Sequence, residues 1–216
     1  SKEYPVVILT GPRQVGKTTM LQKLMQGSER NYVTLDDLNE RALAQSDPQM
    51  FFQMHKPPVL IDEVQYAPGL LIYVKILADR DHRPGDFWLT GSQAFRLTEL
   101  AGESLAGLAC LLHMTTLSQS ERYGDGFSRP LTLSVDALQE RVKHHRPAET
   151  PEMFQRIFQG SMPALASGAI TKRNRFYSSY IATYILSRIF SSSAGRLTRW
   201  NSFGFLRQSH AARGRW

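Results

Sequence analysis

The chain has little cysteine and no long apolar run. Its single cysteine, Cys110, cannot form an internal disulfide, and no pair or quartet of cysteines has zinc-ligand spacing. The longest late apolar candidate, YIATYILSRIF at 180–190, falls short of the roughly 20 residues that a membrane span requires. The apolar stretch near the N-terminus is too short for a signal peptide. These absences favour a reducing compartment and predict a cytoplasmic protein with no membrane contact.

Acidic residues are absent from 153–216, although this segment holds ten Lys and Arg. Residues 1–152 hold the other 16 basic residues and all 19 acidic ones, so the overall charge of +7 arises at the end of the chain. A basic surface suggests contact with nucleic-acid phosphates. An acid-free, serine-rich segment is also typical of a chain that does not fold. The charge pattern therefore leaves open a DNA contact through the C-terminal part.

Expected strands and helices alternate through the first 114 residues. Apolar runs predict five strands, at 6–10, 32–37, 59–64, 86–92 and 105–114, with helix as an alternative for the last. Helices are expected at 17–25, 40–46, 49–54 and 69–80. This alternation indicates an α/β fold with a parallel sheet covered on both faces. Beyond about residue 115 the pattern weakens into a small helical extension, with helices expected at 134–149, 151–166 and 175–190.

The stretch GPRQVGKTTM at 11–20 lies between the first expected strand and the first expected helix. Its spacing of Gly11, Gly16, Lys17 and Thr18 is that of a phosphate-binding loop. Glycines let backbone N–H groups turn toward a phosphate, the helix N-terminus attracts the anion, the lysine reaches the β- and γ-oxygens, and the threonine ligates magnesium. The predicted cofactor contacts are Gly11, Pro12, Arg13, Gln14, Val15, Gly16, Lys17, Thr18 and Thr19, with Lys17 also a catalytic candidate.

Asp62 and Glu63 follow the apolar run at 59–61. They should emerge at the carboxyl edge of a buried strand, where ligands bind in open α/β sheets. In that position Asp62 would hold magnesium through its water shell, and Glu63 would orient or deprotonate an attacking water. Small-molecule kinases need no activated water, so the adjacent Glu63 favours hydrolysis. A polar strand end that simply faces solvent is the alternative.

Thr90, Ser92 and Gln93 end the fourth expected strand. A strand inserted between those that carry the loop and the acids would bring one of these side chains to the γ-phosphate as a sensor. Thr and Ser also cap ordinary turns, so the two interpretations stand equally. We keep Thr90 and Ser92 as cofactor-binding candidates.

Five blocks occur in a recognisable order: GPRQVGKTTM, YVTLDD, VLIDEVQYAP, FWLTGSQAFRL and ESLAG. As a set they resemble a group of prokaryotic ATP-binding proteins of the AAA superfamily, in which a C-terminal domain of unknown function follows the ATPase domain. FQGSMPALA and FYSSYIATYI resemble the group's linker, so the resemblance covers about residues 4–186. It implies an AAA-type core with a five-stranded sheet, ATP and Mg²⁺ as ligands, and the roles given above for Lys17, Thr18, Asp62 and Glu63.

Two arginines that the group usually has are missing. Leu108 stands in place of one, and the sequence after Ile185 lacks the usual Arg-Asp pair. An arginine at the γ-phosphate contributes about 10³ to 10⁵ in rate in related hydrolases. Loss of such a group would impair hydrolysis while leaving binding intact. Arg13 and Arg96 are the candidates to replace it, and for each of them an exposed structural arginine is the favoured alternative.

We expect three parts: an ATP-binding domain at 1–120, a helical extension at 121–186 and a divergent tail at 187–216. The abrupt change in composition predicts that the tail is a truncated or frame-shifted product. The functional expectation is an Mg-ATP-binding protein with an ATPase-type site. A nucleotide-gated DNA-binding or scaffold module and a non-functional fragment are the alternatives. The oligomeric state stays open, with a homo-oligomer among the options.

Overall fold

The computed structural model describes residues 3–92, 94–123, 132–144 and 148–185. The chain divides into two compact units between Ala169 and Ile170. Within the described ranges, none of the helices has the length and apolar character needed to cross a bilayer. The predicted tail at 187–216 lies outside these ranges. The predicted domain borders therefore remain predictions.

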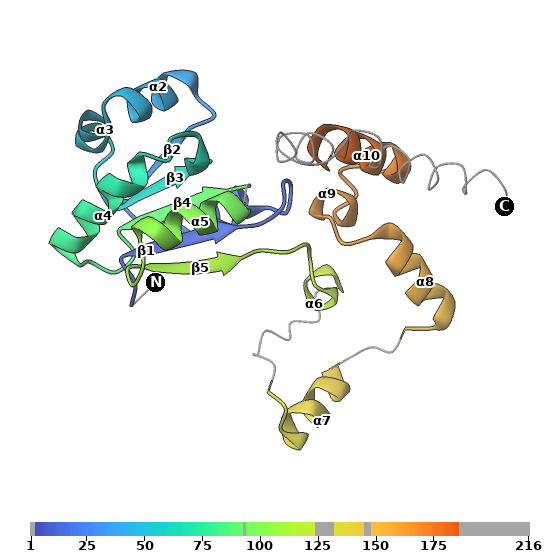
Figure 1. Ribbon diagram of the computed structural model, residues 1–216. Helices are drawn as coiled ribbons and strands as arrows, with labels where there is room; N and C mark the ends of the chain where they lie inside the picture. Colours follow the sequence, from blue (N-terminus) through green and yellow to red (C-terminus); the bar gives the residue numbers. More distant parts are fainter. Residues whose placement is uncertain (1–2, 93, 124–131, 145–147, 186–216) are drawn as a thin grey trace. The chain divides into compact units, whose positions relative to one another are not determined.

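Five parallel strands form one sheet in the order β2-β3-β4-β1-β5 (Figure 1). The strands are β1 (Val6–Thr10), β2 (Asn31–Thr34), β3 (Val59–Asp62), β4 (Phe87–Gly91) and β5 (Ala109–His113). This confirms the α/β class and the five-stranded parallel sheet, and it shows that the fifth segment is a strand. Because β4 lies between β1 and β3, the carboxyl ends of these three strands are neighbours at one edge of the sheet.

Helices cover both faces of the sheet: α2 to α5 contribute to the core on one face, and α1 packs on the other. The helices of this region are α1 (Lys17–Leu24), α2 (Leu38–Ser46), α3 (Pro48–Met54), α4 (Leu70–Asp81) and α5 (Ala94–Ser104), with the 3-10 turn η1 at Val64–Tyr66. On one face Ile8, Ile61 and Leu89 belong to a large core that includes residues of α2 to α5. On the other face Leu9 and Leu60 pack with residues of α1. The strands read as continuous apolar runs because side chains alternate between two buried faces.

Helix α5 was absent from the sequence-based expectation. Leu97, Leu100 and Ala101 recur at helical spacing, so a signal was present. Leu97 and Ala101 are buried in the large core. The helix is therefore held by tertiary packing on the sheet, and it carries the chain from the end of β4 to the start of β5.

Two strands end at least two residues earlier than predicted. The segment expected at 32–37 stops at Thr34, because the Asp37 carboxylate accepts hydrogen bonds from the N–H groups of Asn39 (2.8 Å) and Glu40 (3.3 Å) and so caps α2. The segment expected at 59–64 stops at Asp62, because Glu63 adopts a left-handed conformation and η1 begins at the next residue, Val64. Local capping and one backbone angle thus decide both ends.

Replacing Asp47 with alanine should destabilise the fold. Asp47 ends α2 through its own N–H, and its carboxylate accepts the N–H of Met50 (2.9 Å) at the start of α3. Loss of such a cap costs about 1 kcal/mol, which lowers the melting temperature by about 2–4 °C in a chain of this size. Thermal unfolding of Asp47→Ala beside Asp47→Asn measures the effect. Asparagine also caps helices, so Asp47→Asn should keep most of the melting temperature. An equal fall in both variants would show that the loss of the cap hydrogen bond does not cause the destabilisation.

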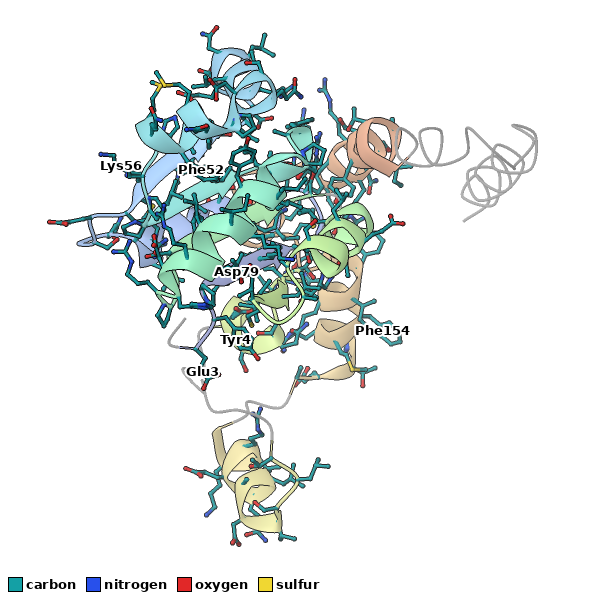
Figure 2. All side chains as sticks on the ribbon, turned by 60° about the vertical axis from the view of Figure 1, so that its left-hand side comes forward. Glu3, Tyr4, Phe52, Lys56, Asp79 and Phe154 are labelled. Carbon is teal, nitrogen blue, oxygen red and sulfur yellow. The ribbon has the colours of Figure 1, made fainter. Side chains whose placement is uncertain are left out.

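The segments after β5 are short helices. They are α6 (Gln119–Tyr123), α7 (Val135–His144), α8 (Thr150–Gln159) and α9 (Pro163–Ala166), and the second unit holds α10 (Arg173–Tyr180) followed by a π-helical turn at Ile181–Ile185. The helix expected at 151–166 is split, because Gly160 has φ 71° between α8 and α9. One side of α8 exposes four apolar residues, Met153, Phe154, Ile157 and Phe158. Figure 2 shows Phe154 projecting from this helix.

Candidate functional site

The loop between β1 and α1 turns through residues with positive φ, namely Gly11 (149°), Gln14 (64°) and Gly16 (96°). A Cβ on Gly11 would lie 2.2 Å from the carbonyl oxygen of Met114, so the chain leaving β5 requires glycine there. The first N–H groups of a helix have no partner inside the helix, and Gly16 supplies no side-chain cap for those of α1. The loop therefore ends at an uncapped helix N-terminus, which suits an anion.

Lys17 is buried in the curve of this loop, with only 6% of its surface exposed. Its Nζ donates to the carbonyl oxygens of Gly11 (3.0 Å) and Pro12 (2.8 Å). A buried ammonium group requires acceptors or an anion close to it. The loop thus holds a positive charge beside the uncapped start of α1, as the phosphate-binding prediction requires.

The other predicted loop residues differ in exposure. Val15 is buried, whereas Arg13, Gln14 and Thr19 are exposed. The structure places all of them in one loop and the first turn of α1. Because the Val15 side chain is buried, any contact of this residue with a ligand would have to come from its backbone, and such contact stays a prediction.

Asp62, at the end of β3, is the centre of a hydrogen-bond cluster and is 6% exposed. Its Oδ2 accepts hydrogen bonds from the hydroxyls of Thr18 (2.8 Å) and Tyr32 (3.4 Å). Its Oδ1 accepts from the Thr90 hydroxyl and from the Glu63 N–H (3.1 Å). Four donors from four segments hold the carboxylate in one orientation, and the Thr18 bond joins the start of α1 to the acidic pair.

Tyr32 is a member of this cluster that the sequence analysis missed. It lies on β2 and pairs with Leu60, two residues before Asp62, so the two side chains share a face of the sheet. Burial, and then the charge of Asp62, raises the pKa of the Tyr32 hydroxyl. The hydroxyl therefore stays protonated and can donate to Asp62. The position of Tyr32 within YVTLDD was the available signal.

Glu63 lies beside Asp62 but has different partners. Its backbone is left-handed, with φ 55° and ψ 43°, a conformation that is uncommon outside glycine and often found at functional sites. Its Oε2 accepts from the Ser92 hydroxyl (3.2 Å) and from the side-chain amide of Gln65. The two carboxylates of the pair thus occupy distinct environments, in line with the separate roles predicted for them.

Thr90 and Ser92 contact the acids from β4 and from the residue after it. The position of β4 between β1 and β3 is the arrangement that the sensor hypothesis requires. Thr90 donates to Asp62, and Ser92 donates to Glu63. Contact of either side chain with nucleotide stays a prediction, and Gln93 lies outside the described residues.

Leu108 lies at the opposite edge of the sheet. Its carbonyl accepts from the N–H of Val6 (3.2 Å) at the start of β1, and its side chain packs against the large core. The four residue steps along β1 place it about 13 Å from the edge that carries the loop. An arginine at this position would therefore start far from the phosphate loop of the same chain. The Arg96 side chain and the positions after Ile185 lie outside the described part of the chain.

The sheet order, the loop between β1 and α1, and the acidic pair at the end of β3 together define a nucleotide-binding domain of the P-loop class. Residues 3–123 match the family model described as AAA domain. This match covers more than half of the chain, which therefore belongs to the AAA domain family. The AAA resemblance inferred from the sequence blocks is confirmed.

The chain is similar to proteins from bacteria, an archaeon and a nematode. Uncharacterised proteins of Mycobacterium tuberculosis and Mycobacterium bovis are each 37% identical over 115 residues, which cover 53% of this chain and 26% of theirs. The chain thus spans about a quarter of the length of these relatives.

Two solved structures were compared as well. The Walker-type ATPase of Pyrococcus abyssi is 16% identical with a TM-score of 0.48, covering 88% of this chain and 70% of that one. PCH-2 of Caenorhabditis elegans is 21% identical with a TM-score of 0.39, covering 56% and 37%.

Proposed function

We propose that the chain binds ATP together with magnesium at the loop between β1 and α1 and hydrolyses it at an ATPase-type site. The observation that carries this proposal is the 2.8 Å hydrogen bond between Thr18 and Asp62. It joins two motifs that lie 44 residues apart in the sequence. The proposed phosphate cradle and the proposed catalytic acids are therefore parts of one site.

Phosphate binding would use the backbone of the loop and one side chain. The N–H groups at the start of α1 and the positive end of its dipole favour an anion. The Lys17 ammonium, now bonded to two carbonyl oxygens of the loop, would exchange part of that bonding for the β- and γ-phosphate oxygens. Charge-assisted bonds to phosphate are stronger than bonds to neutral carbonyls, so this exchange favours binding.

Thr18 and Asp62 fit a magnesium ion by their chemistry. A hydroxyl and a carboxylate are oxygen ligands of the kind that Mg²⁺ prefers, and this ion commonly uses one or two carboxylates together with water and substrate phosphates. In the described residues no group of three or more His, Cys, Asp and Glu side chains could hold a metal by itself. Magnesium bound with the nucleotide would neutralise charge on the phosphates.

Glu63 would accept the proton of the attacking water. Its two side-chain hydrogen bonds from Gln65 and Ser92 both reach Oε2. Oε1 would then be the carboxylate oxygen that receives a water proton, which is the task of a general base. We propose that turnover is slow, because the arginine usual after Ile185 in the resembling group is missing.

The direct test is nucleotide binding and turnover by the unmodified chain. ATP is titrated with and without Mg²⁺, and phosphate release is followed in the same samples. The proposal expects saturable binding, stronger with Mg²⁺, and slow release of phosphate. A chain that binds no nucleotide would refute the proposal.

We also propose a cytoplasmic location and assembly into a homo-oligomer.

A second candidate function is a nucleotide-gated DNA-binding or scaffold module. It is favoured by the ten basic and zero acidic residues at 153–216. If two or more of these residues contact phosphates, DNA affinity should fall by about tenfold between 50 and 200 mM salt. Binding of a labelled duplex by the full chain and by a variant that ends at residue 186 tests this. Equal affinity of both would exclude a role for the tail.

A further inference from the structure

Gln65 is a buried polar residue that has no role in the binding of ATP and magnesium described above. It lies in η1, two residues after Glu63, and is 4% exposed. Its amide nitrogen donates to Glu63 Oε2, whereas its amide oxygen is buried without a hydrogen-bond partner in the described residues. An unpaired buried oxygen lowers stability. An apolar side chain of similar size would avoid that loss, so a requirement other than packing favours an amide here.

The chemistry of Glu63 sets the orientation of this amide. A carboxylate only accepts hydrogen bonds, so the NH₂ group of Gln65 must face it. The amide oxygen then points toward β4, where a Cβ on Gly91 would come within 2.2 Å of it and within 2.1 Å of Leu97 Cδ1. Glycine at position 91 therefore leaves the space that the Gln65 amide occupies. The position of one amide depends on both η1 and β4.

We propose that Gln65 is a positioning residue for Glu63, holding Oε2 so that Oε1 faces the water that attacks ATP; this inference rests on the proposed function. Gln65 and Ser92 approach the same oxygen from η1 and from the end of β4. Two donors restrict rotation of the carboxylate more than one can. Proton transfer depends steeply on geometry, so this restriction acts on the rate of hydrolysis and leaves ATP binding to the loop.

The principal test replaces Gln65 with methionine in the full chain. Methionine keeps the length and the unbranched shape of glutamine but cannot donate to Glu63. We expect kcat for ATP hydrolysis to fall about 10- to 100-fold, with KM for ATP within about twofold. The melting temperature should stay the same or rise, because the unpaired oxygen is removed. Gln53→Met, on the exposed side of α3, is the matched control and should leave kcat unchanged.

A second variant keeps the shape of the side chain and removes only its hydrogen-bond donor. In Gln65→Glu, assayed at a pH where both carboxylates are ionised, the side chain at position 65 cannot donate to Glu63. Positioning by the amide predicts that kcat falls about 10- to 100-fold with KM for ATP within about twofold. A role in packing alone predicts an unchanged kcat, because glutamate has the shape of glutamine.

The outcomes separate this inference from the proposed function. If the unmodified chain hydrolyses ATP and Gln65→Met keeps its full kcat, the inference is overturned and the proposed function stands. If the unmodified chain hydrolyses no ATP, both are overturned. Where Gln65→Met fails to fold, Gln65→Glu decides: a lower kcat with KM for ATP within about twofold supports the inference, and an unchanged kcat overturns it.

Discussion

Replacing Lys17 with alanine is expected to weaken ATP binding by about 100-fold or more. The Lys17 ammonium is the buried cation of the loop, and its Nζ lies 3.0 Å and 2.8 Å from two loop carbonyl oxygens. Hydrogen bonds to charged groups contribute about 1.5–3 kcal/mol each, and every 1.4 kcal/mol changes affinity about tenfold. Loss of the bonds to two phosphates therefore accounts for the expected effect. Equilibrium titration with a fluorescent ATP analogue measures it.

Two further variants control this experiment. Lys17→Met keeps most of the buried aliphatic stem and should lose affinity to the same extent, which separates loss of charge from loss of packing. Lys23→Ala removes an exposed basic residue from the last turn of the same helix and should bind ATP normally. Unchanged affinity in both Lys17 variants would mean that the loop does not bind the phosphates.

Replacing Glu63 with glutamine is expected to retain ATP binding and to abolish most of the turnover. Glutamine has the shape of glutamate, but it cannot take a proton from water. General base catalysis contributes about 10² to 10⁴ in rate, so kcat should fall by that factor. Affinity should not decrease, because a negative charge near the phosphates is removed. Single-turnover phosphate release and equilibrium binding, measured on the same protein, test both parts.

Glu29→Gln is the control for this variant. Glu29 is an exposed carboxylate beyond the end of α1, so its substitution changes the net charge by the same amount and should leave turnover intact. Weakened ATP binding in Glu63→Gln would contradict the assignment of a catalytic role separate from binding. Full turnover in Glu63→Gln would show that the water is activated by another group.

The strands were predictable because their sequence signal is local. The run VVILT at Val6–Thr10 is buried at every position and apolar at all but Thr10, since both faces of the sheet are covered. The strand ends were harder to predict. Asp37 caps α2, and Glu63 leaves the strand through a left-handed backbone angle. Both depend on a single residue whose side-chain partner or backbone conformation has no periodic pattern.

The helix between β4 and β5 shows a different limit. Leu97 and Ala101 have helical spacing, yet a segment of this length forms a stable helix only when one side is buried. The surface that buries them is made by strands distant in sequence. Their spacing was a sufficient hint, but the packing that makes the helix stable is a tertiary property.

The candidate site divides in the same way. Gly16, Lys17 and Thr18 form a local motif, and the chemistry of phosphate binding can be derived from their spacing. Tyr32 and Gln65 carry no such motif. Tyr32 joins the site because β2 lies beside β3, and Gln65 joins it because its amide in η1 donates to Glu63.

The sequence by itself determined the alternation of strands and helices, the phosphate loop and the presence of an acidic pair after a buried strand. Only the tertiary structure decided that β4 separates β1 from β3, and that Thr18 meets Asp62 across 44 residues. The physical reason is that helical and strand patterns arise from neighbours along the chain, whereas side-chain hydrogen bonds between strands depend on strand order and register. Those two properties are set by the packing of the whole sheet.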